Sequence, residues 1–169
     1  LVSLGIGQGE LSVTPIQLAK YTALLANNGK SADPHFLKGY MDKQTGSFVP
    51  SQLHKIQLNI SQATFDIVRK SMFNVVNGAG TATSIRLPNI EISGKTGTAQ
   101  NPHGKPHSLF LGFAPYDKPK IAVVVMVENA GYGSTTAAPI ARDLIKAYLD
   151  KNNLPQETAQ VKGPEKGAN

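Results

Sequence analysis

A lysine set among threonines and glycines is the strongest chemical signal in the sequence. Residues 91–100 read Glu-Ile-Ser-Gly-Lys-Thr-Gly-Thr-Ala-Gln, with Lys95, Thr96, Gly97 and Thr98 at the centre. As a β-strand, this stretch would place both threonine hydroxyls on one face and Lys95 on the other, because side chains alternate along a strand. Gly97 lacks a Cβ, so a substrate or another backbone can approach closely. Such a strand edge offers a cation, two hydroxyls and backbone N–H groups to a carboxylate or to the oxyanion of an acyl transfer.

A Lys-Thr-Gly triplet can also arise by chance on an exposed hairpin, so its meaning depends on the segments around it. Residues 90–99, 108–114 and 120–127 have the character of strands. Their short connections predict antiparallel neighbours, since a parallel return needs a dozen or more residues. The apolar run 121–127 predicts a strand that is covered on both faces.

Three helices are expected around these strands. Thr14 and Pro15 predict the start of a helix over 14–28, which is apolar on much of its circumference and should be buried. Ser61 can cap a second helix over 61–77. After it, Gly80-Thr81-Ala82 should open a short helical turn that directs the chain towards the lysine strand. A third helix over 136–149 should pack on the sheet through an apolar stripe of Ile140, Leu144, Ile145, Tyr148 and Leu149.

The bulk composition narrows the function classes. The chain has 169 residues, no cysteine and a net charge of +6. The lysines are scattered without interleaved aromatics, so nucleic-acid binding is not predicted, although a basic surface facing anionic lipid or an acidic polymer is compatible. The longest apolar run, 121–127, is too short to cross a bilayer. The sequence predicts neither a cofactor nor a metal site.

Glycine and histidine residues supply further candidates. The loop Gly5-Ile6-Gly7-Gln8-Gly9 does not predict phosphate binding, because no Gly-Lys-Ser/Thr follows it; from its residues alone it is a tight turn. Residues 101–107 form a Pro/Gly-rich loop that is a candidate gate for substrate. His107, at its end, could reach the cleft or bond to the loop, whereas His35 and His54 are expected on the surface.

Further motifs flank the triplet on both sides. They occupy residues 3–9, 13–19, 110–115, 127–129 and 137–141. Together with the triplet, they resemble the C-terminal half of the transpeptidase domain of class B penicillin-binding proteins, especially the elongation type. The resemblance covers residues 1–149 and implies an α+β fold like that of serine β-lactamases, with an antiparallel sheet flanked by helices and only part of the domain present. Residues 150–169 are expected to be a disordered tail.

The resemblance implies a serine acyltransferase. A serine would attack a D-Ala-D-Ala stem peptide of peptidoglycan and pass the acyl group to a neighbouring amine, and β-lactams would stall the reaction at the acyl stage. Lys95 and Thr98 would be catalytic, with the Thr98 N–H as an oxyanion donor. Thr96, Gly97, Thr98 and His107 would contact the substrate. The hydroxyls of Thr96 and Thr98 would bind its carboxylate, and the glycine loop 5–9 would lie near the active site.

The other two motifs of this chemistry are missing from the sequence. No serine is followed by lysine three places on or by asparagine two places on. We therefore expect an upstream segment to supply Ser-x-x-Lys and Ser-x-Asn and to cover the strand face around Val123 and Val125. A location on the periplasmic side of the inner membrane follows from the resemblance. So do partnerships with a membrane-embedded glycosyltransferase and with elongation-complex proteins.

Two other readings of the resemblance stay open. The first is a β-lactamase or D,D-carboxypeptidase of the same fold, in which water replaces the acceptor amine. The second is a non-catalytic module, either a penicillin sensor or a scaffold.

Overall fold

A three-stranded antiparallel sheet lies at the centre of the molecule. The computed structural model describes residue 7 and residues 12–153. Strands β5 (Ser93–Ala99), β6 (His107–Ala114) and β7 (Ile121–Val127) lie in that order, each antiparallel to the next. Thr96 is opposite Phe110, and Phe110 is opposite Val125. The three strands and their antiparallel order confirm the sequence prediction.

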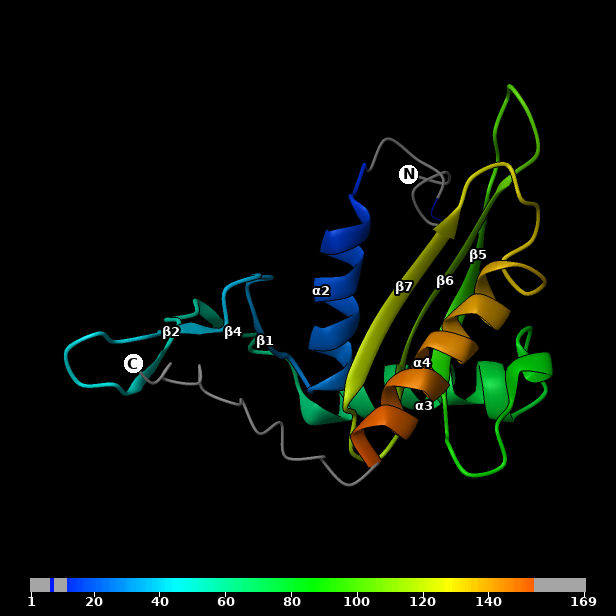
Figure 1. Cartoon of the computed structure of the whole chain (residues 1–169). Helices are drawn as coiled ribbons and strands as arrows, with labels where there is room; N and C mark the ends of the chain where they lie inside the picture. The colour runs from blue at the N-terminus through cyan, green and yellow to red at the C-terminus, as the bar shows by residue number, and fades with distance from the viewer. Residues whose placement is uncertain (1–6, 8–11, 154–169) are drawn as a thin grey trace, which may run out of the picture.

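Helices cover both faces of this sheet. Helix α4 (Ala137–Asn153) packs on one face, while α2 (Pro15–Ala26) and α3 (Gln62–Asn77) pack on the other, α2 beside β7 and α3 beside β5 (Figure 1). The 3₁₀ turn η1 (Thr83–Ile85) connects α3 to β5. This layering confirms the expected α+β architecture.

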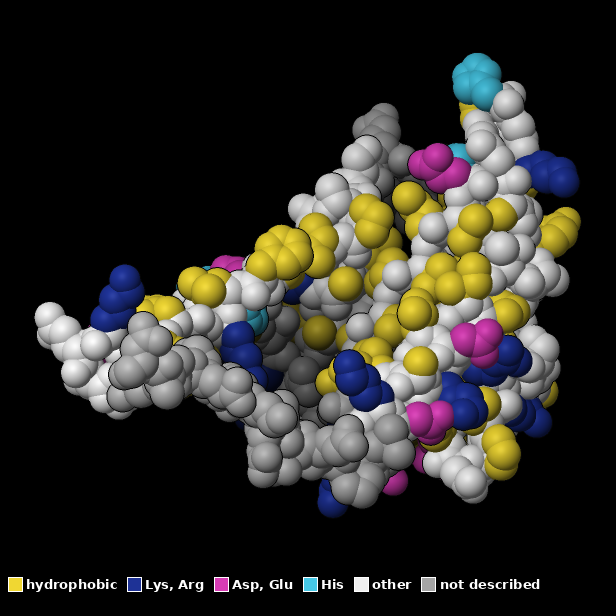
Figure 2. All heavy atoms as spheres, viewed as in Figure 1, with side chains coloured by type: hydrophobic (Ala, Val, Ile, Leu, Met, Phe, Trp, Pro, Cys, Tyr) yellow, Lys and Arg dark blue, Asp and Glu magenta, His cyan; other side chains and the backbone are white. Residues whose placement is uncertain are grey.

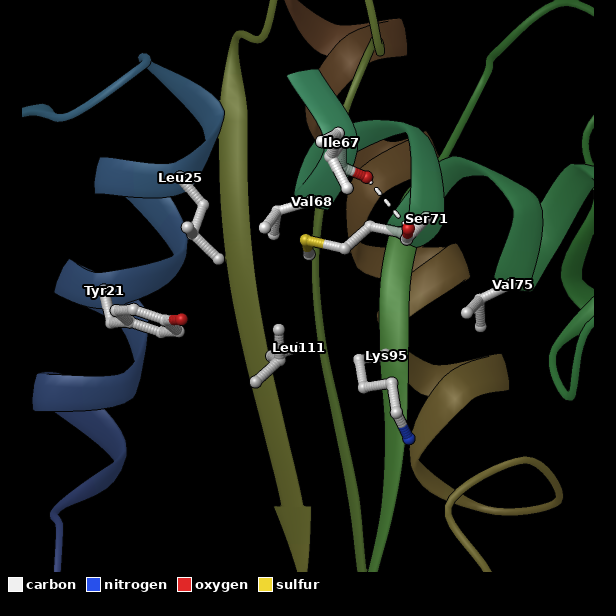
Figure 3. Close-up of a pocket in the computed structure, with 9 residues that line it drawn as sticks. Tyr21, Leu25, Ile67, Val68, Ser71, Val75, Lys95 and Leu111 are labelled. Carbon is white, nitrogen blue, oxygen red and sulfur yellow. Dashed lines mark hydrogen bonds between the residues drawn. The ribbon is translucent and has the colours of Figure 1, made fainter. Parts of the chain in front are cut away.

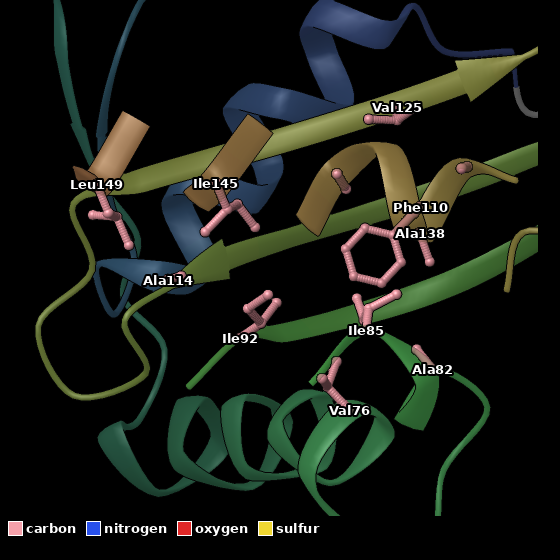
Figure 4. Close-up of a cluster of buried hydrophobic side chains, with 12 residues drawn as sticks. Val76, Ala82, Ile85, Ile92, Phe110, Ala114, Val125, Ala138, Ile145 and Leu149 are labelled. Carbon is pink, nitrogen blue, oxygen red and sulfur yellow. The ribbon is translucent and has the colours of Figure 1, made fainter. Parts of the chain in front are cut away.

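Helix α4 contacts the sheet through small residues as well as large ones. Ala138, Ile145 and Leu149 point at Phe110, Ile92 and Ile85 in a closed apolar cluster (Figure 4). The stripe predicted for this helix is only partly right, because Ile140, Leu144 and Tyr148 are 43%, 51% and 42% exposed. The sheet-facing positions belong instead to Ala137, Ala138, Ala141, Ile145 and Leu149. Helix α4 also continues to Asn153, past its expected end, and the remainder of the expected tail lies outside the described residues.

The caps of α2 and α3 are those predicted. The Thr14 hydroxyl accepts a hydrogen bond from the Gln17 N–H, while the Gln17 side-chain oxygen accepts one from the Thr14 N–H. At the start of α3, the Ser61 hydroxyl accepts a hydrogen bond from the Thr64 N–H. The prediction that the first helix is buried was wrong for its first two turns, where Ile16 and Tyr21 are 56% and 52% exposed. Only its C-terminal turns, with Leu24 and Leu25, are buried.

Two small hairpin-like sheets between α2 and α3 form an arm that extends away from the body (Figure 1). One pairs β1 (Lys30–Ala32) with β4 (Lys55–Gln57), and the other pairs β2 (Gly39–Met41) with β3 (Phe48–Pro50). The β2–β3 turn is closed by Asp42, whose carboxylate accepts hydrogen bonds from the backbone N–H groups of Gln44 and Thr45. Residues 31–60 therefore have the short strands and turns that were expected.

The less covered face of the sheet is not the face around Val123 and Val125 that was predicted. Val125 is only 8% exposed, and Val123 packs on the same cluster beneath α4. The more open side is the opposite one, where Met126 is 44% exposed. Hydrophobic side chains are also visible along α2 and over the outer surface of α4 (Figure 2). Within residues 12–153, no helix has the length and apolar character needed to span a membrane.

Candidate active site

Strand β5 separates the lysine from the two threonine hydroxyls, as its sequence predicts. Lys95 is opposite Leu111 and lies on the face shared with α2 and α3. Thr96 and Thr98 are opposite Phe110 and Ser108 on the face covered by α4. Lys95 is exposed, and its ammonium donates a hydrogen bond to the Thr96 carbonyl at 2.6 Å. It is the only Lys, Arg, Asp or Glu in the three strands.

An apolar groove lies beside Lys95, between α2 and α3 (Figure 3). Its volume is about 440 Å³. Lys95 contributes the single charged side chain to its walls, at the end of a surface that is otherwise nearly all hydrocarbon. The remaining lining residues are Tyr21, Leu25, Ile67, Val68, Ser71, Met72, Val75 and Leu111. Tyr21 and Ile67 are 52% and 68% exposed, so large apolar groups on the groove walls face outwards.

Thr96 has a partner that the sequence did not indicate. Its hydroxyl oxygen is 2.7 Å from the hydroxyl oxygen of Thr81, which lies in the connection between α3 and η1. The Asn77 amide, at the end of α3, donates to the Ile92 carbonyl at 2.8 Å, just before β5. The segment 77–81 therefore contacts the lysine strand at Thr96 and the chain directly before that strand at Ile92. The sequence predicts a turn in this segment, but nothing in it indicates that the Thr81 hydroxyl would bond to Thr96.

A loop on the α4 side of the sheet holds the other threonine. The Gly133 N–H points at the Thr98 hydroxyl across 3.5 Å. Ser108, fully buried, fixes this loop from the neighbouring strand: its hydroxyl donates to the Tyr132 carbonyl at 2.9 Å and accepts from the Ala137 N–H at 3.0 Å. A Cβ at Gly133 would lie 2.2 Å from the Leu109 oxygen and 2.4 Å from the Gly97 oxygen, so the loop rests directly on the triplet glycine.

His107 bonds to the end of β7. Its Nδ1 accepts a hydrogen bond from the Asn129 backbone N–H at 3.1 Å. Asn129 adopts a left-handed φ of 55°, and its side-chain oxygen accepts from the Asn101 amide at 2.6 Å. Because Nδ1 is the acceptor, the proton of the neutral ring belongs on Nε2. The sequence left open a structural bond from His107 to the loop 101–107; the bond observed instead joins it to Asn129, after β7. Substrate contact by His107 stays a prediction.

Other predicted candidates lie away from β5. His35 and His54 belong to the arm, where the His54 Nδ1 is 3.2 Å from an Asp33 carboxylate oxygen. The hydrogen bond and charge of Lys20, helped by His54, hold the pKa of Asp33 below its usual value. The glycine loop 5–9, apart from Gly7, falls outside the described residues. Within the described part of the chain, no group of His, Asp and Glu residues is arranged to hold a metal ion.

An antiparallel sheet with helices on both faces, carrying Lys-Thr-Gly on its edge strand, defines a domain of the active-site-serine, penicillin-interacting class. Comparison with known proteins supports this class. Residues 1–146 match the penicillin binding protein transpeptidase domain. The chain therefore belongs to the penicillin-binding protein transpeptidase family.

The chain is also similar to individual proteins of this family. It is 35% identical to the peptidoglycan D,D-transpeptidase MrdA of Haemophilus influenzae over 96% of its own length but only 30% of that protein. Among solved structures, it matches Pseudomonas aeruginosa PBP2 in complex with WCK 5153 at 37% identity and a TM-score of 0.68, covering 96% of this chain and 35% of that one. It also matches the imipenem acyl-enzyme complex of penicillin-binding protein A from M. tuberculosis at 28% identity and a TM-score of 0.73, covering 85% and 32% of the two chains.

Proposed function

We propose that this chain forms the substrate-binding strand and oxyanion side of a peptidoglycan D,D-transpeptidase. The observation that carries the proposal is the position of Lys95. It is the sole charged side chain of the three strands, and it lies on an exposed strand at the end of an apolar groove. A cation there favours a substrate carboxylate and the deprotonated form of a nearby serine hydroxyl. Thr96 and Thr98 would bind the carboxylate, and the Thr98 N–H would stabilise the oxyanion.

The groove between α2 and α3 supports a second part of the proposal. A helix from another segment of the transpeptidase would bury its apolar face against Tyr21, Leu25, Ile67 and Leu111. That helix would bring the Ser-x-x-Lys nucleophile close to Lys95. The chain spans about a third or less of its relatives, which leaves room for such a segment in proteins of this family. We refer below to this chain joined to a segment with both missing motifs as the completed transpeptidase.

The remaining assignments rest on the family resemblance, with support from relatives named as peptidoglycan D,D-transpeptidases and solved as β-lactam acyl-enzyme complexes. Acceptance of stem peptides ending in D-Ala-D-Ala, acylation by β-lactams, and cross-linking to a neighbouring amine belong to the completed transpeptidase. An elongation role fits the MrdA and PBP2 relatives. With that role we propose a location on the periplasmic side of the inner membrane and contact with a membrane-embedded glycosyltransferase and elongation-complex proteins.

Acylation of the completed transpeptidase by a labelled penicillin tests the proposal. Lys95→Ala should slow acylation strongly, and Thr96→Val should slow it less, since a hydrogen bond to a charged group is worth ~1.5–3 kcal/mol. Lys118→Ala is the matched control, because Lys118 is an exposed lysine in the turn between β6 and β7. Equal acylation rates in Lys95→Ala, Thr96→Val and Lys118→Ala would show that the Lys-Thr-Gly triplet is not part of the active site.

Two further measurements define the reaction and the role of this chain. With a stem-peptide substrate, the amount of cross-linked product relative to hydrolysed product separates a transpeptidase from a carboxypeptidase. The 169-residue chain alone should gain no mass from penicillin, because it contains no Ser-x-x-Lys. A covalent adduct on the isolated chain would place the nucleophile within these residues and refute the proposed division of the site.

A further inference from the structure

We propose that Thr81 is a positioning residue of this site: its hydroxyl donates a hydrogen bond to Thr96 and turns the Thr96 proton towards the carboxylate of a bound ligand. The inference rests on the proposed function, in which Thr96 binds that carboxylate. The observation behind it is the 2.7 Å separation of the two hydroxyl oxygens. Thr81 is exposed and Thr96 is half-buried, so the pair lies where a ligand can reach it.

Counting protons fixes the direction of the hydrogen bond. A threonine hydroxyl has one proton to donate and lone pairs with which to accept, whereas an ionised carboxylate can only accept. When Thr96 donates to a carboxylate, its proton is used, and only Thr81 can supply the proton between the two hydroxyls. Each donated bond polarises the next, so the bond from Thr81 strengthens the bond from Thr96 to the ligand.

The backbone around Thr81 is fixed firmly enough for this role. A Cβ at Gly80 would lie 2.3 Å from the Val75 Cα, so the chain passes close to the last turns of α3. On the other side, the Ala82 N–H donates to the Val75 carbonyl at 3.0 Å, and the Ala82 side chain is fully buried. Thr81 itself is β-branched, so its side chain has few rotamers to lose when it holds its partner.

Ligands with and without a carboxylate separate this role from a structural one. In the completed transpeptidase, Thr81→Val should lower the rate constant of acylation by benzylpenicillin about 2- to 13-fold, which corresponds to the ~0.5–1.5 kcal/mol of one neutral hydrogen bond. Thr81→Ser should restore most of the rate, because serine retains the hydroxyl. With benzylpenicillin methyl ester, which offers only neutral ester oxygens, Thr81→Val should lose clearly less of its rate, because a bond to a neutral acceptor is weaker than one to a carboxylate.

The matched control is Thr83→Val, which changes an exposed threonine in η1 two positions further along the chain. It should leave acylation by both ligands unchanged. In a Thr96→Val background, Thr81→Val should have no further effect, because the hydroxyl through which it acts is gone.

Several outcomes would overturn the role proposed for Thr81. They are an unchanged rate with benzylpenicillin in Thr81→Val, an equal loss with the acid and the ester, or a full second loss in the Thr96→Val background. Failure of the underlying function looks different, because Lys95→Ala and Thr96→Val would then also leave acylation unchanged. If those two variants lose activity while Thr81→Val does not, only the role of Thr81 is refuted.

Discussion

Replacing Gly133 by alanine should displace the loop that rests on the triplet strand. Gly133 does not have a left-handed φ, so an alanine there meets no backbone strain. The alanine would instead clash with backbone atoms. Its Cβ would be 2.2 Å from the Leu109 carbonyl oxygen, 2.4 Å from the Gly97 carbonyl oxygen and 2.9 Å from the Gly97 nitrogen. None of these three atoms can move away by a change of rotamer. The loop or the strand must shift instead.

The contact distances set the size of the effect. An ordinary carbon–oxygen contact is about 3.3 Å or longer, so the loop must retreat by roughly 1 Å. The hydrogen bond from the Gly133 N–H to the Thr98 hydroxyl is already 3.5 Å long, near the upper limit of hydrogen-bond length, so this shift would break it. The bond from the Ala138 N–H to the Gly133 carbonyl, 2.9 Å long in the first turn of α4, would be distorted. Overpacking of this kind costs ~1–3 kcal/mol.

Urea unfolding of the completed transpeptidase, followed by circular dichroism, measures this loss. Penicillin acylation should slow in parallel, because the Thr98 hydroxyl loses its bond from the Gly133 N–H. Gly131→Ala is the matched control in the same loop. Gly131 has a φ of 82° and no atom within 4 Å of an added Cβ, so alanine there costs only left-handed strain of ~1–2 kcal/mol. It should leave acylation almost unchanged. If Gly133→Ala has the stability and acylation rate of the unmodified protein, the close packing of the loop on Gly97 is refuted.

Three shorter predictions concern other polar contacts. Ser108→Ala should destabilise the fold by ~1–3 kcal/mol in the same unfolding assay, because it leaves the buried Ala137 N–H without its acceptor; an unchanged midpoint would contradict this. The lowered pKa of Asp33 means that its contribution to stability is present above its unfolded pKa, near 3.9, and is lost as the pH falls through the folded value. Asp33→Asn should therefore lower stability at neutral pH and flatten the acid limb of the stability curve, and an unaltered acid limb would count against the ion pair. Nitrogen NMR of His107 should show the neutral ring protonated at Nε2, and a proton on Nδ1 would exclude its bond from the Asn129 N–H.

Local pattern was enough to predict the strands and the faces of β5. The alternation of Lys95 with Thr96 and Thr98 depends only on strand geometry, and the pairing with β6 retains it. Short connections determined the antiparallel order, and Thr14 and Ser61 marked helix starts that both use side-chain caps. These features are set by a few neighbouring residues, so the sequence determines them without knowledge of tertiary contacts.

Features that depend on tertiary packing, such as the sheet-facing side of α4, could not be predicted from local sequence pattern. The stripe predicted for α4 correctly included Ile145 and Leu149, but it also assigned the exposed Ile140, Leu144 and Tyr148 to the sheet. Ala137, Ala138 and Ala141 face the sheet instead, because their small side chains let α4 pack close to Phe110 and Ile85. The pairing of Thr81 with Thr96 has a related cause: the residues are fifteen positions apart, and only the path of the chain after α3 brings their hydroxyls together.

The edge position of β5 has a consequence for solubility. Within the described chain, β5 pairs with β6 on one side only. Such an edge can recruit strands from other molecules into an intermolecular sheet, and a lysine in the middle of the strand is one protection against this. Lys95 is at that position, so the ammonium that would attract a substrate also hinders self-association. Lys95→Ala would leave this strand edge without a charge. Slower acylation by this variant then has two sources, aggregation and the loss of the ammonium group from the site. Lys95→Arg keeps the charge on the edge while changing the shape of the cation, and light scattering beside each acylation assay distinguishes the two effects.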